Sequence, residues 1–96
     1  MKFLKNNGFT EEEIKEIIDK YDRDTIKELV FYQDLVEERI DYLKEYGIED
    51  IPRLMLERID IFFVPLKKIK ELFSHYEKDS VVASLNYDAS IFDEMR

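Results

Sequence analysis

The sequence predicts an all-α fold, and three observations support this prediction. Glu, Lys, Ile and Leu are abundant, whereas the 96 residues include two glycines and two prolines, so few positions interrupt a helix. Apolar side chains recur at helical spacing along most of the chain. Two segments end in a glycine followed by an apolar residue, as many helices do. We expect two helical repeat units, stacked as a short solenoid-like bundle, and a C-terminal cap of short helices.

The first predicted helix ends at Gly8, where the chain can adopt a positive φ at little cost. A Schellman ending at this position would bury Phe9 against Leu4. Directly afterwards, Thr10 and Glu13 have the spacing of a capping box, in which the two side chains bond free backbone N–H groups of the helix start. The sequence therefore predicts that one helix stops at Gly8 and that the next begins after Thr10.

The second predicted helix extends from about Glu11 to Tyr21 and presents one apolar face. A short third helix follows, because Thr25 and Glu28 repeat the capping-box spacing. Between the two, residues 22–24 resemble the start of a calcium loop but lack its turn glycine and its final Glu, so we interpret them as a helix cap. The inward residues predicted for both helices are Ile14, Ile17, Ile18, Tyr21, Ile26, Leu29 and Val30.

Residues 34–46 form the clearest of the longer predicted helices, which ends as the first one does. Gly47 follows it, and Ile48 stands where a Schellman ending would pack it on Leu43. Gly8 and Gly47 are therefore the two structural C-caps that we expect. The predicted inward stripe of this helix comprises Leu35, Val36, Arg39, Ile40, Leu43 and Tyr46.

Two prolines predict the starts of two further helices, since a proline in the first helical turn loses no hydrogen bond. Pro52 and Pro65 hold these positions, and Asp79 and Asp88 are expected N-caps of two short helices in the tail. The buried residues predicted for these elements are Leu54, Met55, Ile59, Leu66, Ile69, Leu72, Phe73, Tyr76, Val81, Val82, Leu85, Ile91, Phe92 and Met95.

Composition limits the classes of function. The chain has no Cys, which excludes disulfides, thiolate metal sites and thiol nucleophiles, and a reducing cytoplasm is the compartment we expect. We expect no signal peptide and no membrane contact, because no apolar run approaches the ~18 residues of a membrane span. The net charge of −8 opposes nonspecific binding to nucleic acid.

Aligning Gly8 with Gly47 indicates an internal repeat of 39 residues, a length typical of helical solenoids. Two capped helices of similar length would produce part of this pattern without common descent. We expect a single domain over residues 1–96, composed of repeat one at about 3–41, repeat two at about 42–78 and a C-terminal cap at 79–96.

Within residues 3–76, two sets of residues share one order of features, namely Leu-x-x-x-Gly, an apolar residue and a helix with aliphatic residues. The first set is Leu4, Gly8, Phe9, Thr10, Ile14, Ile17 and Ile18, and the second is Leu43, Gly47, Ile48, Leu54, Phe62 and Phe63. This order resembles the repeats of the mitochondrial transcription termination factor (mTERF) family, which continue through a Pro-x-aliphatic-Leu turn. That proline is absent here, and Asp22 and Asp60 stand near its place.

The resemblance implies a stack of helical units that binds nucleic acid along a basic concave face. Residues 53–78 are the one net basic segment, whereas the rest of the chain is net acidic. The nucleic-acid contacts that this interpretation predicts are Arg53, Arg58, Lys67, Lys68, Lys70 and Lys78.

Catalysis finds little support in the sequence. His75, the single histidine, adjoins Ser74 on one predicted helix, where neighbouring side chains point about 100° apart and cannot form a nucleophile–base pair. The acidic run at 11–13 suits the dipole of a helix start better than a metal site. We therefore expect no enzyme and no cofactor.

The aromatic residues are numerous for so small a core, so they either fill that core or form an exposed patch. They are Tyr32, Tyr42, Phe62, Phe63, Phe73, Tyr76, Tyr87 and Phe92. Our leading hypothesis is a non-enzymatic module that binds a protein partner, or a second copy as a homodimer, through an aromatic and aliphatic surface flanked by acidic residues. The alternative is a nucleic-acid-associated, mTERF-like module that uses the basic residues of 53–78.

Overall fold

The predicted all-α class is confirmed by the computed structural model, which describes residues 1–95. This part of the chain contains eight α-helices, one 3₁₀ helix and no strand. None of its helices combines the length and the apolar character that a membrane crossing requires. The elements are α1 (Lys2–Asn6), α2 (Glu11–Lys20), α3 (Arg23–Phe31), α4 (Gln33–Tyr46), α5 (Ile51–Glu57), η1 (Ile59–Phe63), α6 (Leu66–Ser74), α7 (Lys78–Tyr87) and α8 (Ile91–Met95).

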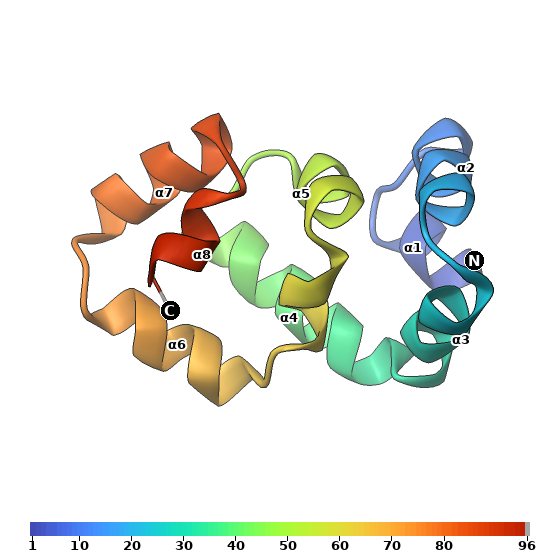
Figure 1. The fold of residues 1–96 in the computed structure, drawn as a ribbon, viewed down its shortest axis with the longest axis horizontal. Coiled ribbons are helices and arrows are strands. Elements are labelled where there is room, and N and C mark those ends of the chain that lie inside the picture. Colours follow the sequence, from blue (N-terminus) through green and yellow to red (C-terminus); the bar gives the residue numbers. More distant parts are fainter. Residues whose placement is uncertain (96) are drawn as a thin grey trace.

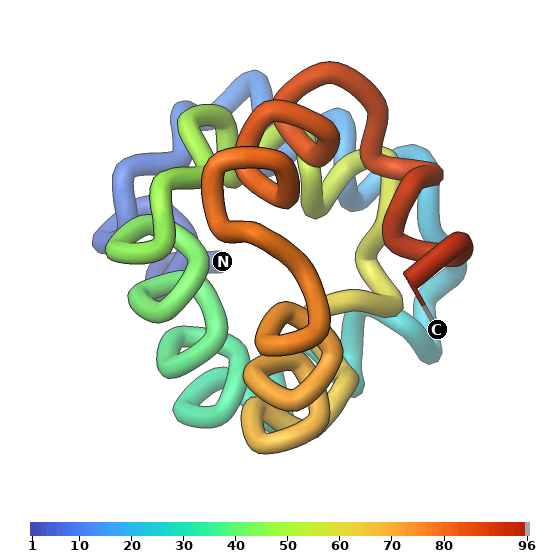
Figure 2. The backbone as a smooth tube through the Cα atoms, turned by 90° about the vertical axis from the view of Figure 1, so that its left-hand side faces the viewer, coloured from blue at the N-terminus to red at the C-terminus, as the bar shows by residue number. Residues whose placement is uncertain are grey.

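The helices follow one another along the longest axis of the molecule, which measures 34 Å (Figure 1). α1 to α3 lie at one end, α6 to α8 lie at the other, and α4 runs between them. α5 packs chiefly on α2, and η1 packs on both α4 and α5. Seen along the long axis, α4 and α6 run side by side (Figure 2), and side chains of the two helices are in contact.

Both predicted glycine caps are confirmed. Gly8 and Gly47 have φ angles of +92° and +120°, which a residue with a Cβ atom adopts only at a cost. The N–H of Phe9 donates to the carbonyl of Leu4 at 3.1 Å, and the equivalent bond after α4 is 3.0 Å long. These are the six-to-one bonds of Schellman endings, and the residues that donate them are buried.

One of the two predicted capping boxes is confirmed and the other is wrong. The side chains of Thr10 and Glu13 each accept the other residue's backbone N–H, at 3.1 and 2.9 Å. α3, in contrast, begins before Thr25, because the Asp22 carboxylate accepts the Thr25 N–H at 2.8 Å. An Asp is as good an N-cap as a Thr, so the earlier residue takes this role and Glu28 lies inside the helix.

Most of the remaining helix starts follow the sequence signals. Asp50 caps α5 by accepting a backbone N–H at 3.1 Å, and Pro52 lies in the first turn. α6 follows Pro65 directly. α7 begins one residue before Asp79, so this residue is not its N-cap. Just before α8, Asp88 accepts a backbone N–H at 3.0 Å.

Most of the predicted inward residues line one hydrophobic core. Four of them are exposed instead, by 39–47% of their surface. Helical periodicity indicates the direction of an apolar stripe, but the width that becomes covered depends on the neighbouring elements. The four side chains for which the prediction is wrong are Ile18, Val30, Leu35 and Tyr76.

Candidate functional site

Exposed apolar side chains gather where α3 meets α4. Four large apolar residues within a stretch of six leave 39–79% of their surface in water. The other large exposed apolar side chains of residues 1–95 are Ile18, Tyr76 and Tyr87, which lie on or beside other helices. We call the four residues at the junction the α3–α4 corner: Val30, Phe31, Tyr32 and Leu35.

The corner stands on hydrogen-bonded backbone with no intervening loop. Tyr32 alone separates α3 from α4, with φ −98° and ψ 25°. Its N–H donates to the carbonyl of Glu28 at 2.9 Å, and its carbonyl accepts the N–H of Val36 at 2.9 Å. The rings of Phe31 and Tyr32 meet edge to face, with their centroids 4.9 Å apart. The backbone of the corner is therefore hydrogen-bonded into both helices.

A groove of about 280 Å³ adjoins the corner. One wall is a stripe along α3 and α4 whose members are three or four residues apart, so that they share one side of the helical path. The opposite wall comes from η1, where Phe62 is buried and Phe63 is partly buried. The stripe consists of Glu28, Tyr32, Leu35 and Arg39.

Arg39 joins the two sides of this groove. Its guanidinium donates from Nε to the carbonyl of Val64 and from Nη1 to the carbonyl of Leu35. The residue is 7% exposed, and burial lowers its pKa while the charge of Glu38 opposes this effect. Among residues 1–95, no carboxylate forms an ion pair with it. Arg39 therefore ties α4 to the turn between η1 and α6 through backbone carbonyls.

Carboxylates around the corner form no ion pair among residues 1–95. Residues 22–41 contain seven acidic and three basic side chains. The ion pairs of the described chain lie elsewhere, in α1, α2, α5, η1 and α8. Glu28 lines the groove, and Asp34 and Glu38 are exposed beside and one turn beyond Leu35. We call Glu28, Asp34 and Glu38 the acidic rim.

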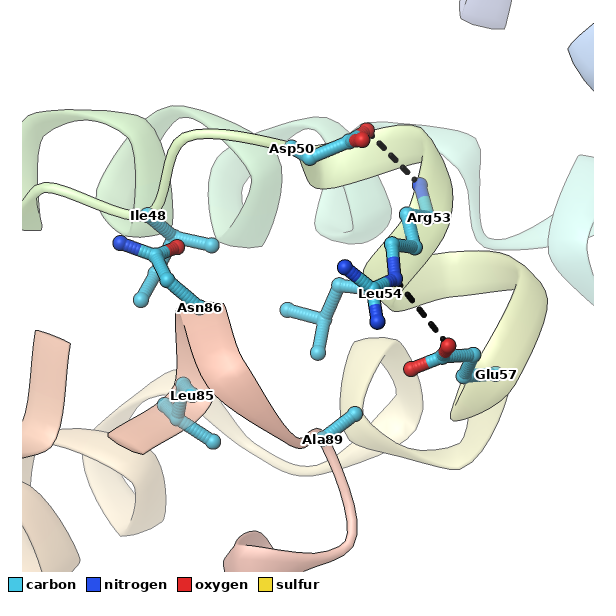
Figure 3. Close-up of a pocket in the computed structure, with 8 residues that line it drawn as sticks. All are labelled: Ile48, Asp50, Arg53, Leu54, Glu57, Leu85, Asn86 and Ala89. Atoms are coloured by element: carbon cyan, nitrogen blue, oxygen red, sulfur yellow. Dashed lines mark hydrogen bonds and ion pairs between the residues drawn. The ribbon is translucent and has the colours of Figure 1, made fainter. Parts of the chain in front are cut away.

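The two arginines predicted as nucleic-acid contacts are ion-paired. Arg53 Nε donates to Glu57 at 3.1 Å (Figure 3). Arg58 donates to Asp60 and to Asp93, both at 2.8 Å, and its Nη1 is buried without a hydrogen-bond partner among the described residues. The hydrogen bond to Asp60 is the largest cause that raises the pKa of Arg58, and it outweighs desolvation. Arg58 thus links η1 to α8.

The four lysines of the predicted basic set lie on α6 or at the start of α7. Lys70 Nζ lies 5.4 Å from the ring centroid of Tyr42, and Lys78 Nζ lies at the same distance from that of Tyr46. Both tyrosines also pack against Phe73. We call Tyr42, Tyr46 and Phe73 the covered cluster. All four lysines are exposed: Lys67, Lys68, Lys70 and Lys78.

The seam between α5 and α7 encloses a cavity of about 20 Å³. Leu54, Leu85 and Ala89 line it (Figure 3), and Asn86 accepts the Glu49 N–H at 3.0 Å. A cavity of this size holds about one water molecule. The seam therefore joins the two helices and has no room for a larger ligand.

The sequence indicated this surface only in part. Tyr32 belongs to the aromatic set that the sequence predicts to be core or exposed patch, whereas Phe31, which is 79% exposed, lies outside this set. The sequence does contain a signal for Phe31, because Leu29 is predicted to face inward and a residue two positions further lies about 200° around a helix. Of the other aromatic candidates, Tyr76 and Tyr87 are exposed. Some of the predicted aromatic residues therefore belong to the core and others to the surface.

Comparisons of the chain with models of protein families, with curated proteins and with solved structures found no match.

Proposed function

We propose that this chain is a non-enzymatic helical module that binds a protein partner, or a second copy of itself, through the α3–α4 corner. The observation that carries the proposal is the exposure of four large apolar side chains within residues 30–35, two of which, Tyr32 and Leu35, line an aromatic groove. Exposed apolar surface with a polar rim is typical of protein interaction sites. A partner that covers it would recover about 25 cal/mol for each Å² removed from water.

The backbone of the corner supports the same proposal. Binding costs free energy when loops and side chains must become ordered. The corner consists of helix ends joined by Tyr32 alone, so little backbone ordering is required. Aromatic anchors on a rigid scaffold commonly contribute most of the binding energy of an interface, and Phe31 and Tyr32 fit this role.

We further propose that two glycine-capped helix pairs are copies of one unit, stacked as a short solenoid. α1–α2 and α4–α5 share the Schellman ending, and their second helices pack on each other. In addition, Lys44 Nζ, from the last turn of α4, donates to the carbonyl of Asn7 at 2.7 Å. The resemblance to mTERF repeats remains a prediction from the sequence.

The nucleic-acid alternative draws its support from the exposed lysines on and beside α6. The ion pairs of Arg53 and Arg58 reduce that support. Titration with labelled DNA and RNA at several salt concentrations tests it, because phosphate contacts require an affinity that falls as salt rises. If neither nucleic acid binds at low salt, this alternative is wrong.

A site-specific crosslinker tests the main proposal. We would place photoreactive p-benzoylphenylalanine at position 31 and, as a matched control, at position 87, because Phe31 and Tyr87 are aromatic and similarly exposed, at 79% and 81%. After irradiation in an extract of cells that produce the chain, we expect adducts with a defined protein or with a second copy from position 31. Adducts that are no stronger than those from position 87, together with monomeric sedimentation, would contradict the proposal.

A further inference from the structure

We infer that the occupant of the α3–α4 corner is a basic amphipathic helix of a partner protein, not a second copy of this chain. The inference rests on the proposed function and specifies the chemistry of the partner. The charge of the acidic rim, the symmetry of self-association and the shape of the groove support it.

The charge around the corner favours a cationic partner. Glu28, Asp34 and Glu38 have no ion pair among residues 1–95. The one cation that lines the groove, Arg39, is 7% exposed and donates from two of its nitrogens to backbone carbonyls, and its single positive charge is outnumbered by the three carboxylates of the acidic rim. Opposite charges across an interface accelerate association and exclude partners of the wrong sign.

The same charge opposes self-association at this surface. A two-fold dimer brings one patch against its own copy, so two acidic rims would face each other across the apolar contact. Like charges placed opposite each other cost free energy and slow the encounter. With a net charge of −8 on each chain, the long-range field adds to this repulsion.

The shape of the site favours a helix. No strand is present in the described chain, so no sheet edge is available to a partner strand there. The groove runs along a stripe of α3 and α4 and is bounded by η1 on its other side, an arrangement that accepts apolar side chains of an amphipathic helix at i, i+3 or i+4, and i+7. Lys or Arg residues beside those anchors would then reach Glu28 and Glu38.

The test is a selection with a defined probe. A phage-displayed library of helical peptides of about 16 residues, or roughly four turns, would carry fixed apolar positions at helical spacing and random residues between them. The library would be selected on the intact chain, and peptides that bind equally to Phe31→Ser would be discarded. We expect the enriched peptides to carry a net positive charge and to bind at least threefold more weakly at high salt than at low salt.

Variants then locate the contact. Phe31→Ser and Leu35→Ser should each weaken the best peptide about tenfold or more, whereas Ile18→Ser and Tyr87→Ser, exposed apolar residues elsewhere, should leave its affinity unchanged. The combined change Glu28→Gln, Asp34→Asn and Glu38→Gln should weaken it about tenfold. The matched control, Glu16→Gln with Asp19→Asn and Glu45→Gln, alters the net charge equally at other exposed positions and should change the affinity less than about threefold.

Each outcome has a distinct consequence. Basic peptides that lose affinity in the corner and rim variants support the inference. Enriched peptides that need Phe31 but are neutral or acidic overturn the basic partner and leave the proposed function standing. Concentration-dependent dimerisation that Phe31→Ser abolishes would also overturn the basic partner and leave the proposed function standing. A monomer that enriches no peptide over Phe31→Ser overturns both, and circular dichroism of every variant shows whether the fold is intact.

Discussion

The helix α4 has aromatic side chains at both ends, and only one end is covered. Near its C-terminus, Tyr42 and Tyr46 are partly buried and pack with Phe73 of α6. At its N-terminus, Phe31 and Tyr32 contact each other but leave 79% and 45% of their surface exposed. Identical residue types therefore contribute to the core at one end and form a surface at the other.

Ring pairing does not explain this difference. The Tyr46–Phe73 centroids lie 4.8 Å apart and the Phe31–Tyr32 centroids lie 4.9 Å apart, and both distances fall in the range of favourable aromatic pairs. The two ends differ in whether another helix covers the aromatic rings. Phe73 of α6 packs on Tyr42 and Tyr46 in the C-terminal half of α4, whereas the corner has only the groove formed with η1 beside it.

The largest predicted effect is the difference in unfolding free energy between variants at the two ends of α4. Phe73→Ala removes a buried ring and should lower the free energy of unfolding by about 3–5 kcal/mol. Phe31→Ala should change it by less than about 0.5 kcal/mol, because the ring is mostly in water. Urea unfolding followed by circular dichroism measures both values. Equal losses would mean that the corner belongs to the core and that the two ends of α4 do not differ in burial.

A second comparison uses the glycine caps, one of which, Gly47, ends α4 beside the covered cluster. Gly47→Ala should cost about 2 kcal/mol, because φ is +120° and a Cβ atom would lie 3.2 Å from Val82 of α7. Gly8→Ala should cost about 1 kcal/mol, since its nearest neighbour, Lys44 Nζ, would lie 3.9 Å away. The same urea titration ranks the two, and a larger loss at Gly8 would contradict the packing at the end of α4.

The lysines over the covered cluster should contribute less. Lys70→Met and Lys78→Met keep the apolar stem but remove the charge above Tyr42 and Tyr46, and each should lower the free energy of unfolding by about 0.5–1 kcal/mol. Lys67→Met, on the same helix as Lys70, is the matched control. If all three variants unfold alike, the contacts between lysine and ring do not stabilise the cluster.

The smallest effect should appear at alkaline pH. Burial, and secondarily the charge of Tyr46, raises the pKa of Tyr42 above its ordinary value of 10.0, and burial raises that of Tyr46. The native state therefore keeps its protons at a pH where the unfolded chain loses them. The resulting stability is fully present below pH 10 and declines as the pH rises through the native pKa.

Urea midpoints across the alkaline range, with tyrosinate absorbance, measure this decline. Tyr42→Phe and Tyr46→Phe should each make it shallower, whereas Tyr87→Phe, which alters an exposed ring, should not. A decline of the same slope in all three variants would show that other groups cause it.

The sequence by itself determined where several helices begin and end. The stops at Gly8 and Gly47 and the start at Thr10 depend on residues within about one helical turn, so local patterns suffice to predict them. Two predicted caps are wrong. At Thr25, Asp22 offers an equally good cap three residues earlier, and α7 begins one residue before Asp79.

Only the tertiary structure decided which apolar and charged side chains are covered. Val30 and Leu35 have the same helical spacing as buried neighbours, yet no later element covers them, and they remain 39% and 47% exposed. Tyr42 is covered by Phe73, which lies 31 residues further along the chain. Arg58 is paired with Asp93, which lies 35 residues further along the chain. Periodicity and composition describe each helix alone, whereas burial and ion pairing depend on helices that are distant in sequence and meet only in the fold.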